Sequence, residues 1–467
     1  TMTGTSTKAP RELKGFGLMG YSIGIAGQFL PNSFLSTFVV QYYVYTVSLN
    51  ALLAGIATFV ALVVYALSSV FFGVITDNQK PGKLGKRRPY LLLSMVFMIP
   101  SIILIWTPPM CTGKFEMNPL TFIYLLVLFS LYNLGFGILR PAYTSMMPEQ
   151  SETEENRVKI GAIQGVVSLV GTVFAILIPI IIAGLVPEPD DVFYWTVGGM
   201  TYTTVVPIIG LVLASVSVLC TSLAFFATNE DHLKERYVEK EKKSVKENLG
   251  RIFEPFKDKK FQPWLGSTLI FNISMKMLML GLYPFLYYVL KLEKTDLYIS
   301  LGVLIPVAGA GFVIWKRKST KSSPLEAYRL AISILSIALS IMVVFFFNLT
   351  LVAKIVIGLI LMGIGISCLV TGYIFPNPII SSLIEEEMIC RKEKSSEDCT
   401  NISGIYFGSY LFTLSISYAV GNFVLGSLFT GKNAENPTII TLLFPLAAIA
   451  FFVSYLVMRK VKIQKAK

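Results

Sequence analysis

The sequence has little of what catalytic or metal chemistry needs. Its one histidine, His232, lies in a segment rich in charges, and its five cysteines form no CxxC pair. There is no HExxH motif, no phosphate-cradling GxxxxGK[ST] loop and no Ser/His/Asp set. We therefore expect neither an enzyme nor a bound metal or cofactor, and the cysteine spacing indicates no disulfide framework.

Charge is also scarce. Only 15% of the 467 residues are charged whereas 54% are hydrophobic, and the mean hydropathy of +0.66 is too high for a soluble multi-domain protein. A membrane-spanning helix needs about 20 mostly apolar residues, and runs of this length recur along the chain. The twelve expected spans are 15–46, 51–75, 90–107, 120–147, 160–185, 202–227, 261–290, 297–315, 327–347, 351–378, 404–429 and 439–458.

The net charge of +12 is unevenly distributed between the loops. Basic residues gather at both termini and in every second loop, whereas the alternate loops hold only scattered lysines. The positive-inside rule therefore places both termini in the cytoplasm, and it accounts for the basic excess without a nucleic-acid partner. A contribution from anionic membrane lipids stays open. The basic segments are 8–14, 80–88, 157–159, 234–260, 316–329, 391–394 and 459–467.

The polar segment 228–260 divides the expected spans into two sets of six. We expect residues 1–227 and 261–467 to form an N-terminal and a C-terminal six-helix bundle, joined by a cytoplasmic linker. A basic loop follows the second span of each half, which is a weak internal symmetry. An all-α membrane protein with this organisation is typical of transporters that bind a solute between two bundles near the membrane midplane.

Five segments resemble the major facilitator superfamily and, within it, the glycoside-pentoside-hexuronide:cation symporter family. They occur in the family's order and at its helix positions, and they extend over the whole chain. The segments are GFGLMGYSIG at 15–24, GKRRP at 85–89, PAYTSMMPE at 141–149 with Asn156-Arg157, ENLGRIFEPFKDKKFQPW at 247–264, and GIYFGSYLFTLSISYAVG at 404–421.

The resemblance implies cation-coupled sugar transport, but the residues that the family uses for it are replaced. The family's second helix carries carboxylates that bind the cation, and the matching positions here are Tyr65 and Ser69. Its sugar-binding acids on the first and fourth helices fall on Ser22 and on Leu139 or Arg140. Its helix-five arginine falls on Gln164 and its helix-eleven lysine on Ser415.

No Asp or Glu lies within any expected span. Proton- or sodium-driven transport usually requires a charged or protonatable group at membrane depth, and the missing carboxylates therefore favour facilitated diffusion. Sodium can also be held by carbonyl and hydroxyl oxygens, which leaves coupling disfavoured but open.

Two cations do lie inside spans, Arg140 on the fourth and Lys276 on the seventh. A charge at this depth is a functional hypothesis by default, and no carboxylate in a span is present to pair with either residue. Both could face a central cavity and bind an anionic substrate. The alternative is that each extends to the membrane surface or bonds to backbone carbonyls.

Neutral polar residues recur at helical spacing on the spans that would line such a cavity. Taken together they favour a cavity for a hydroxyl-rich ligand, although for any single residue hydrogen bonding between neighbouring helices is the better explanation. The candidate substrate-binding residues are Ser22, Gln28, Asn32, Asn133, Arg140, Tyr143, Gln164, Asn272, Lys276, Tyr283, Tyr410 and Ser415.

The loop after the second span predicts a gate. Asp77 together with Lys86, Arg87 and Arg88 is expected to form a cytoplasmic charge cluster that favours one side of alternating access. For the basic residues, their role in setting topology is a sufficient alternative explanation.

The sequence as a whole predicts a multi-pass transporter in the plasma membrane that moves a small polar solute, sugar-like or a sugar acid or other organic anion. Membrane lipids and the solute are the expected partners, and the chain is expected to act as a monomer or as a subunit of a membrane complex. Two alternatives stay open. The fold could serve as a structural or accessory subunit without transport, or it could move a lipid or another amphiphile.

Overall fold

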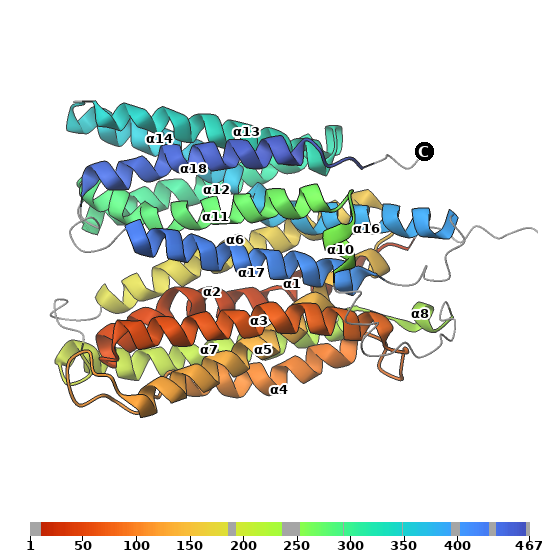
Figure 1. Ribbon diagram of the computed structural model, residues 1–467, viewed down its shortest axis with the longest axis horizontal. Coiled ribbons are helices and arrows are strands. Elements are labelled where there is room, and N and C mark those ends of the chain that lie inside the picture. Colours follow the sequence, from red (N-terminus) through yellow and green to blue (C-terminus); the bar gives the residue numbers. More distant parts are fainter. Residues whose placement is uncertain are drawn as a thin grey trace, which may run out of the picture.

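The computed structural model describes residues 11–184, 193–235, 253–292, 294–347, 349–393, 402–428 and 436–463. In these ranges the chain is helical apart from turns and two isolated β-bridges. Each expected span coincides with one helix or with adjoining helical segments, and the helices run along one common direction (Figure 1). The prediction of an all-α protein is confirmed.

The first half of the chain builds the lower layer of Figure 1. Its helical segments are α1 (Gly15–Ile23), α2 (Ala26–Gln41), η1 (Tyr42–Thr46), α3 (Ala51–Asn78), α4 (Arg88–Leu104), α5 (Pro119–Gln150), α6 (Glu154–Gly184) and α7 (Val197–Ala227). Two short helices follow, α8 (Asp231–Glu235) and α10 (Glu254–Lys257), and the linker residues between them lie outside the described ranges.

The second half builds the upper layer. Its segments are α11 (Gln262–Pro284), η2 (Phe285–Val289), α12 (Lys294–Lys321), α13 (Pro324–Ile341), η3 (Met342–Phe346), α14 (Leu351–Leu369), α15 (Thr371–Ile374), α16 (Pro376–Glu393), α17 (Ser403–Leu428) and α18 (Pro437–Met458).

Polar residues set where many of the helices begin. In each case the side-chain oxygen accepts a hydrogen bond from a backbone N–H of the first turn, which stabilises a helix start by about 1 kcal/mol. These N-caps are Asn50, Asn118, Thr196, Ser323, Thr350 and Asn436.

Apolar side chains cover the outside of the bundle. Seven helical stretches among the described residues are long and apolar enough to cross a membrane. On α3, for example, the large side chains of Leu52, Phe59 and Leu67 are all at least 60% exposed. Soluble proteins rarely expose apolar surface on this scale, so these side chains are suited to contact with lipid.

The two halves repeat one local irregularity. The π-helical turn η1 ends the first long helix of the first half, and η2 ends the corresponding helix of the second half. A residue with a left-handed backbone follows each turn, Ser48 with φ 68° and Lys291 with φ 54°. Since π-turns are rare, their recurrence at equivalent positions supports the internal symmetry that the basic loops suggested.

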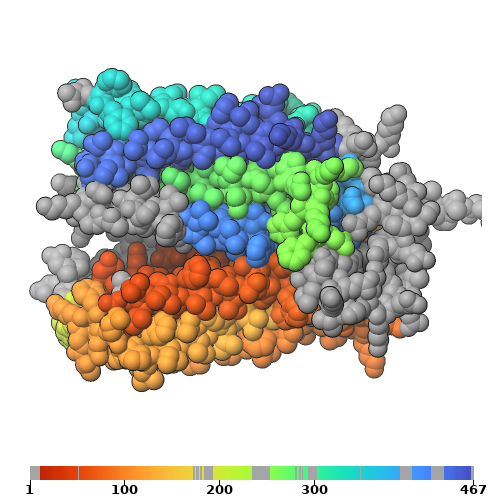
Figure 2. Space-filling view, viewed as in Figure 1, coloured from red at the N-terminus to blue at the C-terminus, as the bar shows by residue number. Residues whose placement is uncertain are grey.

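The halves touch where α3 and α5 of the first meet α16 and α17 of the second, and where α6 meets α12, α15 and α16. Glycines permit the closest contact, because a Cβ atom added at Gly404 would lie 2.4 Å from the carbonyl oxygen of Gly73. This contact lies at the end of the bundle where α3 and α5 end and α17 begins, which we call the Arg87 end. Toward the opposite end, Figure 2 shows a hollow beside α3.

Candidate functional site: a charged closure and a central cavity

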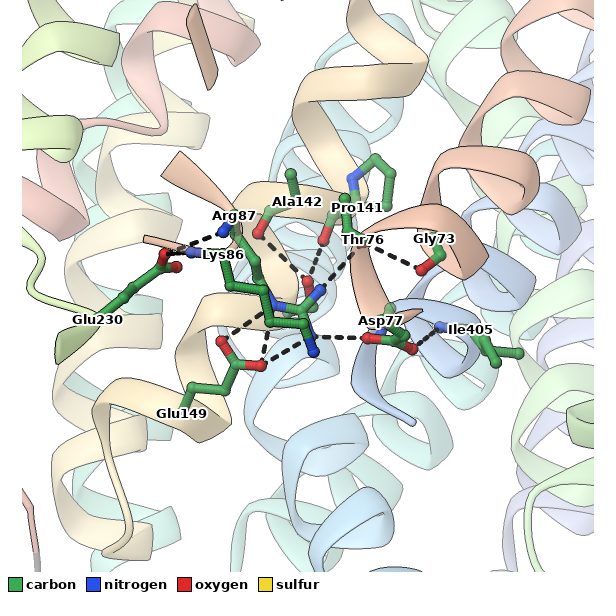
Figure 3. Close-up of polar contacts among 12 residues, drawn as sticks. Gly73, Thr76, Asp77, Lys86, Arg87, Pro141, Ala142, Glu149, Glu230 and Ile405 are labelled. Atoms are coloured by element: carbon green, nitrogen blue, oxygen red, sulfur yellow. Dashed lines mark hydrogen bonds and ion pairs between the residues drawn. The ribbon is translucent and has the colours of Figure 1, made fainter. Parts of the chain in front are cut away.

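Arg87 is the centre of a buried charge cluster at the end of α3, α5 and the loop before α4 (Figure 3). Its Nη2 lies 2.8 Å from Oδ1 of Asp77 and 2.7 Å from Oε1 of Glu149. Its Nε donates to both carboxylate oxygens of Glu149 at 2.9 Å, and its Nη1 donates to the Thr76 hydroxyl at 3.1 Å. The guanidinium is fully buried, and its two carboxylate partners offset the desolvation of its charge.

Asp77 connects this cluster to the second half. Its two carboxylate oxygens accept hydrogen bonds of 2.8 Å from the backbone N–H groups of Gly404 and Ile405. Those groups belong to the first turn of α17, whose N–H donors have no partner within the helix and whose dipole favours a negative charge. The carboxylate therefore holds the start of α17 against the end of α3.

Glu230, just after α7, binds the backbone of the same loop before α4. One of its carboxylate oxygens accepts the backbone N–H groups of Lys86 and Arg87. The glutamate packs so closely on Gly85, which has a φ of 98°, that a side chain there would clash with it. Burial raises the pKa of Glu230, and the two N–H groups oppose that shift. The start of the interhalf linker is thus fixed to the first half.

A second ion pair joins the halves at this end. Nη1 of Arg157, at the start of α6, lies 2.6 Å from Oε2 of Glu385 on α16. The arginine side chain is buried, whereas that of the glutamate is 40% exposed. A contact of this kind is weaker than the Arg87 cluster because water competes for the carboxylate.

The predicted gating residues separate into two groups. Asp77 and Arg87 pair directly, while Lys86 takes part through its backbone, and burial lowers the pKa of its side chain to about 8. Arg88 points elsewhere, since its Nε donates to the Phe225 carbonyl at 2.9 Å and its guanidinium lies over the Phe225 ring. Arg88 therefore anchors α4 on α7 and does not join the cluster.

A small cavity lies between the halves in the middle of the bundle. Its volume is about 50 Å³, which is room for a few water molecules. Arg140 on α5 and Phe29 on α2 are its wall from the first half, and aromatic side chains dominate the wall from the second. The remaining lining residues are Thr268, Phe271, Asn272, Met275, Tyr328, Gly372, Tyr373, Pro376, Tyr410, Leu414 and Tyr418.

Tyr418 relates the two predicted membrane-depth cations, because it lines the cavity with Arg140 and lies against Lys276. Arg140 lines the cavity, and its one close side-chain contact among the described residues is the Phe136 ring, 5.6 Å from its Cζ. Nζ of Lys276 lies 4.8 Å from the centroid of the Tyr418 ring. Within the described part of the chain, neither cation has a carboxylate partner.

The other predicted substrate-binding residues are divided between the cavity and helix packing. Asn272 and Tyr410 line the cavity with Arg140. The side chains of Asn133 and Ser415 instead bond the carbonyl four residues before them on their own helix. Asn32 is half-buried on α2 away from the cavity, and the side chain of Tyr283 lies outside the described part.

Four further candidates lie between helices closer to the Arg87 end or along α1 and α2. Tyr143 and Tyr21 bond each other's backbone carbonyls, and Gln164 links the Tyr143 hydroxyl, at 3.2 Å, to Asn377 of the second half, at 3.4 Å. Ser22 and Gln28 are buried, and the Ser22 hydroxyl and the Gln28 amide nitrogen have no hydrogen-bond partner among the described atoms.

Several residues of the site were missed by reasoning from the sequence. Glu149, Glu230 and Glu385 were visible only as acids outside the expected spans, and nothing in the sequence shows which partner each one meets. Tyr418 could have been found, because it lies two helical turns after Tyr410 on the same face of the eleventh expected span.

The geometry describes a multi-pass membrane transporter: two helical halves, closed against each other at one end, around a polar centre. A family model described as MFS/sugar transport protein matches residues 20–465. The chain therefore belongs to this family, the glycoside-pentoside-hexuronide symporter branch of the major facilitator superfamily. The resemblance found in the sequence is confirmed, and the family consists of transporters, not enzymes.

Curated relatives are distant. The chain is 24% identical over 290 residues to the uncharacterized symporter YnaJ of Bacillus subtilis, covering 61% of this chain and 57% of YnaJ. It is 29% identical over 168 residues to the isoprimeverose transporter of Lactiplantibacillus pentosus, covering 36% of this chain and 33% of that one. The matches thus span from about a third to just over half of the relatives' length.

Two solved structures share the fold over nearly the whole chain. FucP, the fucose:proton symporter of E. coli, in its outward conformation superimposes with a TM-score of 0.63 at 13% identity, covering 96% of this chain and 99% of FucP. An outward-facing bacterial homologue of the iron transporter ferroportin gives a TM-score of 0.63 at 14% identity, with 96% and 98% covered. At these identities the likeness establishes the fold alone.

Proposed function

We propose that this protein is a carrier that moves a small polar solute, sugar-like or an organic anion, by exposing a central site alternately to the two sides of the membrane. The observation that carries the proposal is the one-sided closure of the two halves. Asp77, Gly404 and the pair of Arg157 with Glu385 hold one end shut, while Figure 2 shows a hollow toward the other. The polar cavity lies between these ends.

The proposal assigns residues 1–227 and 261–467 as the two moving bodies, each with six of twelve spans, and residues 228–260 as their connection. The Arg87 end belongs to the cytoplasm together with both termini, because the basic loops gather there. The described state is then open to the outside, like the two solved structures to which the fold was compared. The plasma membrane is the proposed location.

Transport by this carrier proceeds as facilitated diffusion. The second-helix positions where the family has cation-binding carboxylates are Tyr65 and Ser69, and Ser69 bonds a carbonyl of its own helix. Every acid among the described residues lies in a loop, near a helix end or, for Glu385, Glu386 and Glu387, in the part of α16 beyond the expected span 351–378. No carboxylate is therefore placed to bind a proton or a sodium ion beside the solute.

Solute flux into liposomes that contain the purified protein tests this proposal. The expected result is equilibration of the solute at the same rate with and without imposed pH and sodium gradients. Uphill accumulation that follows either gradient would show coupling and overturn the facilitator mode. Failure of any solute in a broad sugar and organic-acid panel to cross would count against transport itself and favour an accessory role.

A further inference from the structure

Arg140 differs from three other described arginines whose side chains are buried or half-buried. Arg87 has two carboxylate partners, Arg157 has Glu385, and Arg329 donates to the Met458 carbonyl. Arg140 has only the face of Phe136 within the described part of the chain, although it faces a cavity at mid-depth. A cation in low dielectric without a counter-charge is unfavourable, so this position calls for an anion.

Lys276 brings a second cation to the same place from the other half. Its Nζ lies over the ring of Tyr418 at 4.8 Å, and Tyr418 itself lines the cavity beside Arg140. Tyr410 lines the same cavity as Arg140, and Tyr65 stacks on Phe136, the ring over which Arg140 lies, with centroids 5.0 Å apart. Two cations on opposite halves thus approach one cluster of tyrosines.

A buried and unused donor lies in the same cluster. The hydroxyl of Tyr65 has no hydrogen-bond partner among the described atoms, although the residue is only 4% exposed. Buried hydroxyls are nearly always paired, because leaving one unpaired is unfavourable. A ligand that accepts hydrogen bonds and carries negative charge would satisfy Tyr65 and Arg140 together.

We propose that the transported solute is an anion whose carboxylate or phosphate group binds between Arg140 of the first half and Lys276 of the second, with Tyr65 and Tyr418 as further donors. This inference rests on the proposed carrier function and names its substrate class. In the family's cation symporters acids occupy the central site, whereas here the charge of the site is reversed.

The placement of the cations on opposite halves has a kinetic consequence. When the halves rock with the site empty, two unscreened positive charges move past each other in low dielectric, which raises the barrier. A bound anion removes that repulsion, so the loaded carrier reorients faster than the empty one. Exchange of anion for anion is therefore expected to be several-fold faster than net flux.

Thermal unfolding of the purified protein in detergent tests the binding step. The probes are two matched pairs that differ only in their anionic group: gluconate with sorbitol, and glucose 6-phosphate with glucose. The anionic member of at least one pair should raise the unfolding temperature while its neutral partner does not. The two pairs distinguish a carboxylate from a phosphate as the recognised group.

Variants link that effect to the two cations. R140Q and K276Q should each weaken anion binding about tenfold or more, since each removes a charge-assisted bond, and R140K should retain part of it. The matched controls R317Q and K318Q alter exposed cations on α12 and should bind as the unaltered protein does. Equal stabilisation by neutral probes, anion binding that persists in both Gln variants, or no anion-dependent shift with any probe would overturn the inference.

Flux measurements separate this inference from the carrier proposal. Vesicles loaded with the binding anion should release it several-fold faster when the same anion is present outside. If sorbitol or glucose is transported and R140Q does not change the rate, the carrier proposal stands and the anion site is overturned. Anion-selective binding without any flux would support the anion site and reject the carrier.

Discussion

Buried charges at the Arg87 end have partners of opposite charge, whereas those around the central cavity have none among the described residues. At the Arg87 end every oxygen and nitrogen of the Asp77, Arg87 and Glu149 cluster that has been described faces a partner of complementary charge or polarity. Around the cavity, Arg140 and Lys276 face aromatic rings and no carboxylate of the described chain.

The difference indicates what each region does. A paired cluster is complete in itself, so it stabilises one arrangement of the helices and can act as a closure. An unpaired cation gains a counter-charge only when an anion binds. The Arg87 end therefore contributes to the equilibrium between closed and open conformations, and the cations of the cavity region contribute to binding of the solute.

The largest loss of stability is expected when Arg87, the centre of the buried charge cluster, is replaced. R87M leaves Asp77 and Glu149 buried without their counter-charge, which should lower the free energy of unfolding by about 3–5 kcal/mol. Thermal or denaturant unfolding in detergent measures it. The adjacent R88M is the matched control, because Arg88 contacts only Phe225 in the described structure and should lose about 1 kcal/mol. Equal losses in the two variants would refute the assignment.

A purely steric change should open the same end without touching a charge. In G404A the new Cβ would meet the Gly73 carbonyl, so α3 and α17 must separate and the Arg87 end should populate its open state. Spin labels at two exposed residues, Gln79 after α3 and Lys259 just before α11, should report a longer distance. G55A is the control, since a Cβ at Gly55 meets nothing within 4 Å. An unchanged spin-label distance in G404A would contradict the inference that the contact of Gly404 with Gly73 keeps this end closed.

Lys86 tests how far the cluster tolerates a further cation. Burial lowers its pKa to about 8, so above that pH the unfolded chain binds more protons than the folded one and stability should rise with pH toward the ordinary lysine pKa. K86M should remove this rise and add about 2 kcal/mol of stability at pH 7. Unfolding temperatures from pH 7 to 10 measure both effects. The exposed K83M should retain the unaltered slope.

The smallest effect is expected at the exposed link between the halves. E385Q removes the partner of Arg157, but the carboxylate is already 40% exposed. The loss in stability should be about 1 kcal/mol or less, with a correspondingly slight shift of the spin-label distance towards the open state. A loss as large as that of R87M would mean that this pair, and not the Arg87 cluster, holds the end closed.

The sequence was sufficient for the helices because lipid imposes a simple requirement. Runs of about 20 apolar residues are needed to cross the bilayer, and polar caps such as Asn50 and Asn118 mark helix starts locally. The internal breaks were not predictable in the same way. The π-turns at Tyr42–Thr46 and Phe285–Val289 arise from how the backbone bonds after a helix end, and no residue type specifies them.

The site was predictable in its components and not in its pairings. Arg140 and Lys276 stand out in any hydropathy analysis because charge at that depth is rare. Whether Arg87 or Arg88 would enter the charge cluster depends on how the loop after α3 turns at Gly85, and this turn is fixed by Glu230, which is more than a hundred residues later in the chain. The polar stripes also could not show that the side chains of Asn133 and Ser415 would each bond their own helix.

Asp77, Arg87 and Glu149 all belong to the first half, and this shared origin determines what must break when the Arg87 end parts. The ion pairs of this cluster travel together as one body, so the surface of separation crosses the hydrogen bonds from Gly404 and Ile405 to Asp77 and the pair of Arg157 with Glu385, but none of the cluster's own ion pairs. Water can replace the Asp77 carboxylate at the two amides. The cluster can thus separate from α17 without losing the partner of any of its own charges, which keeps the closed and open forms of this end close enough in free energy for repeated cycling.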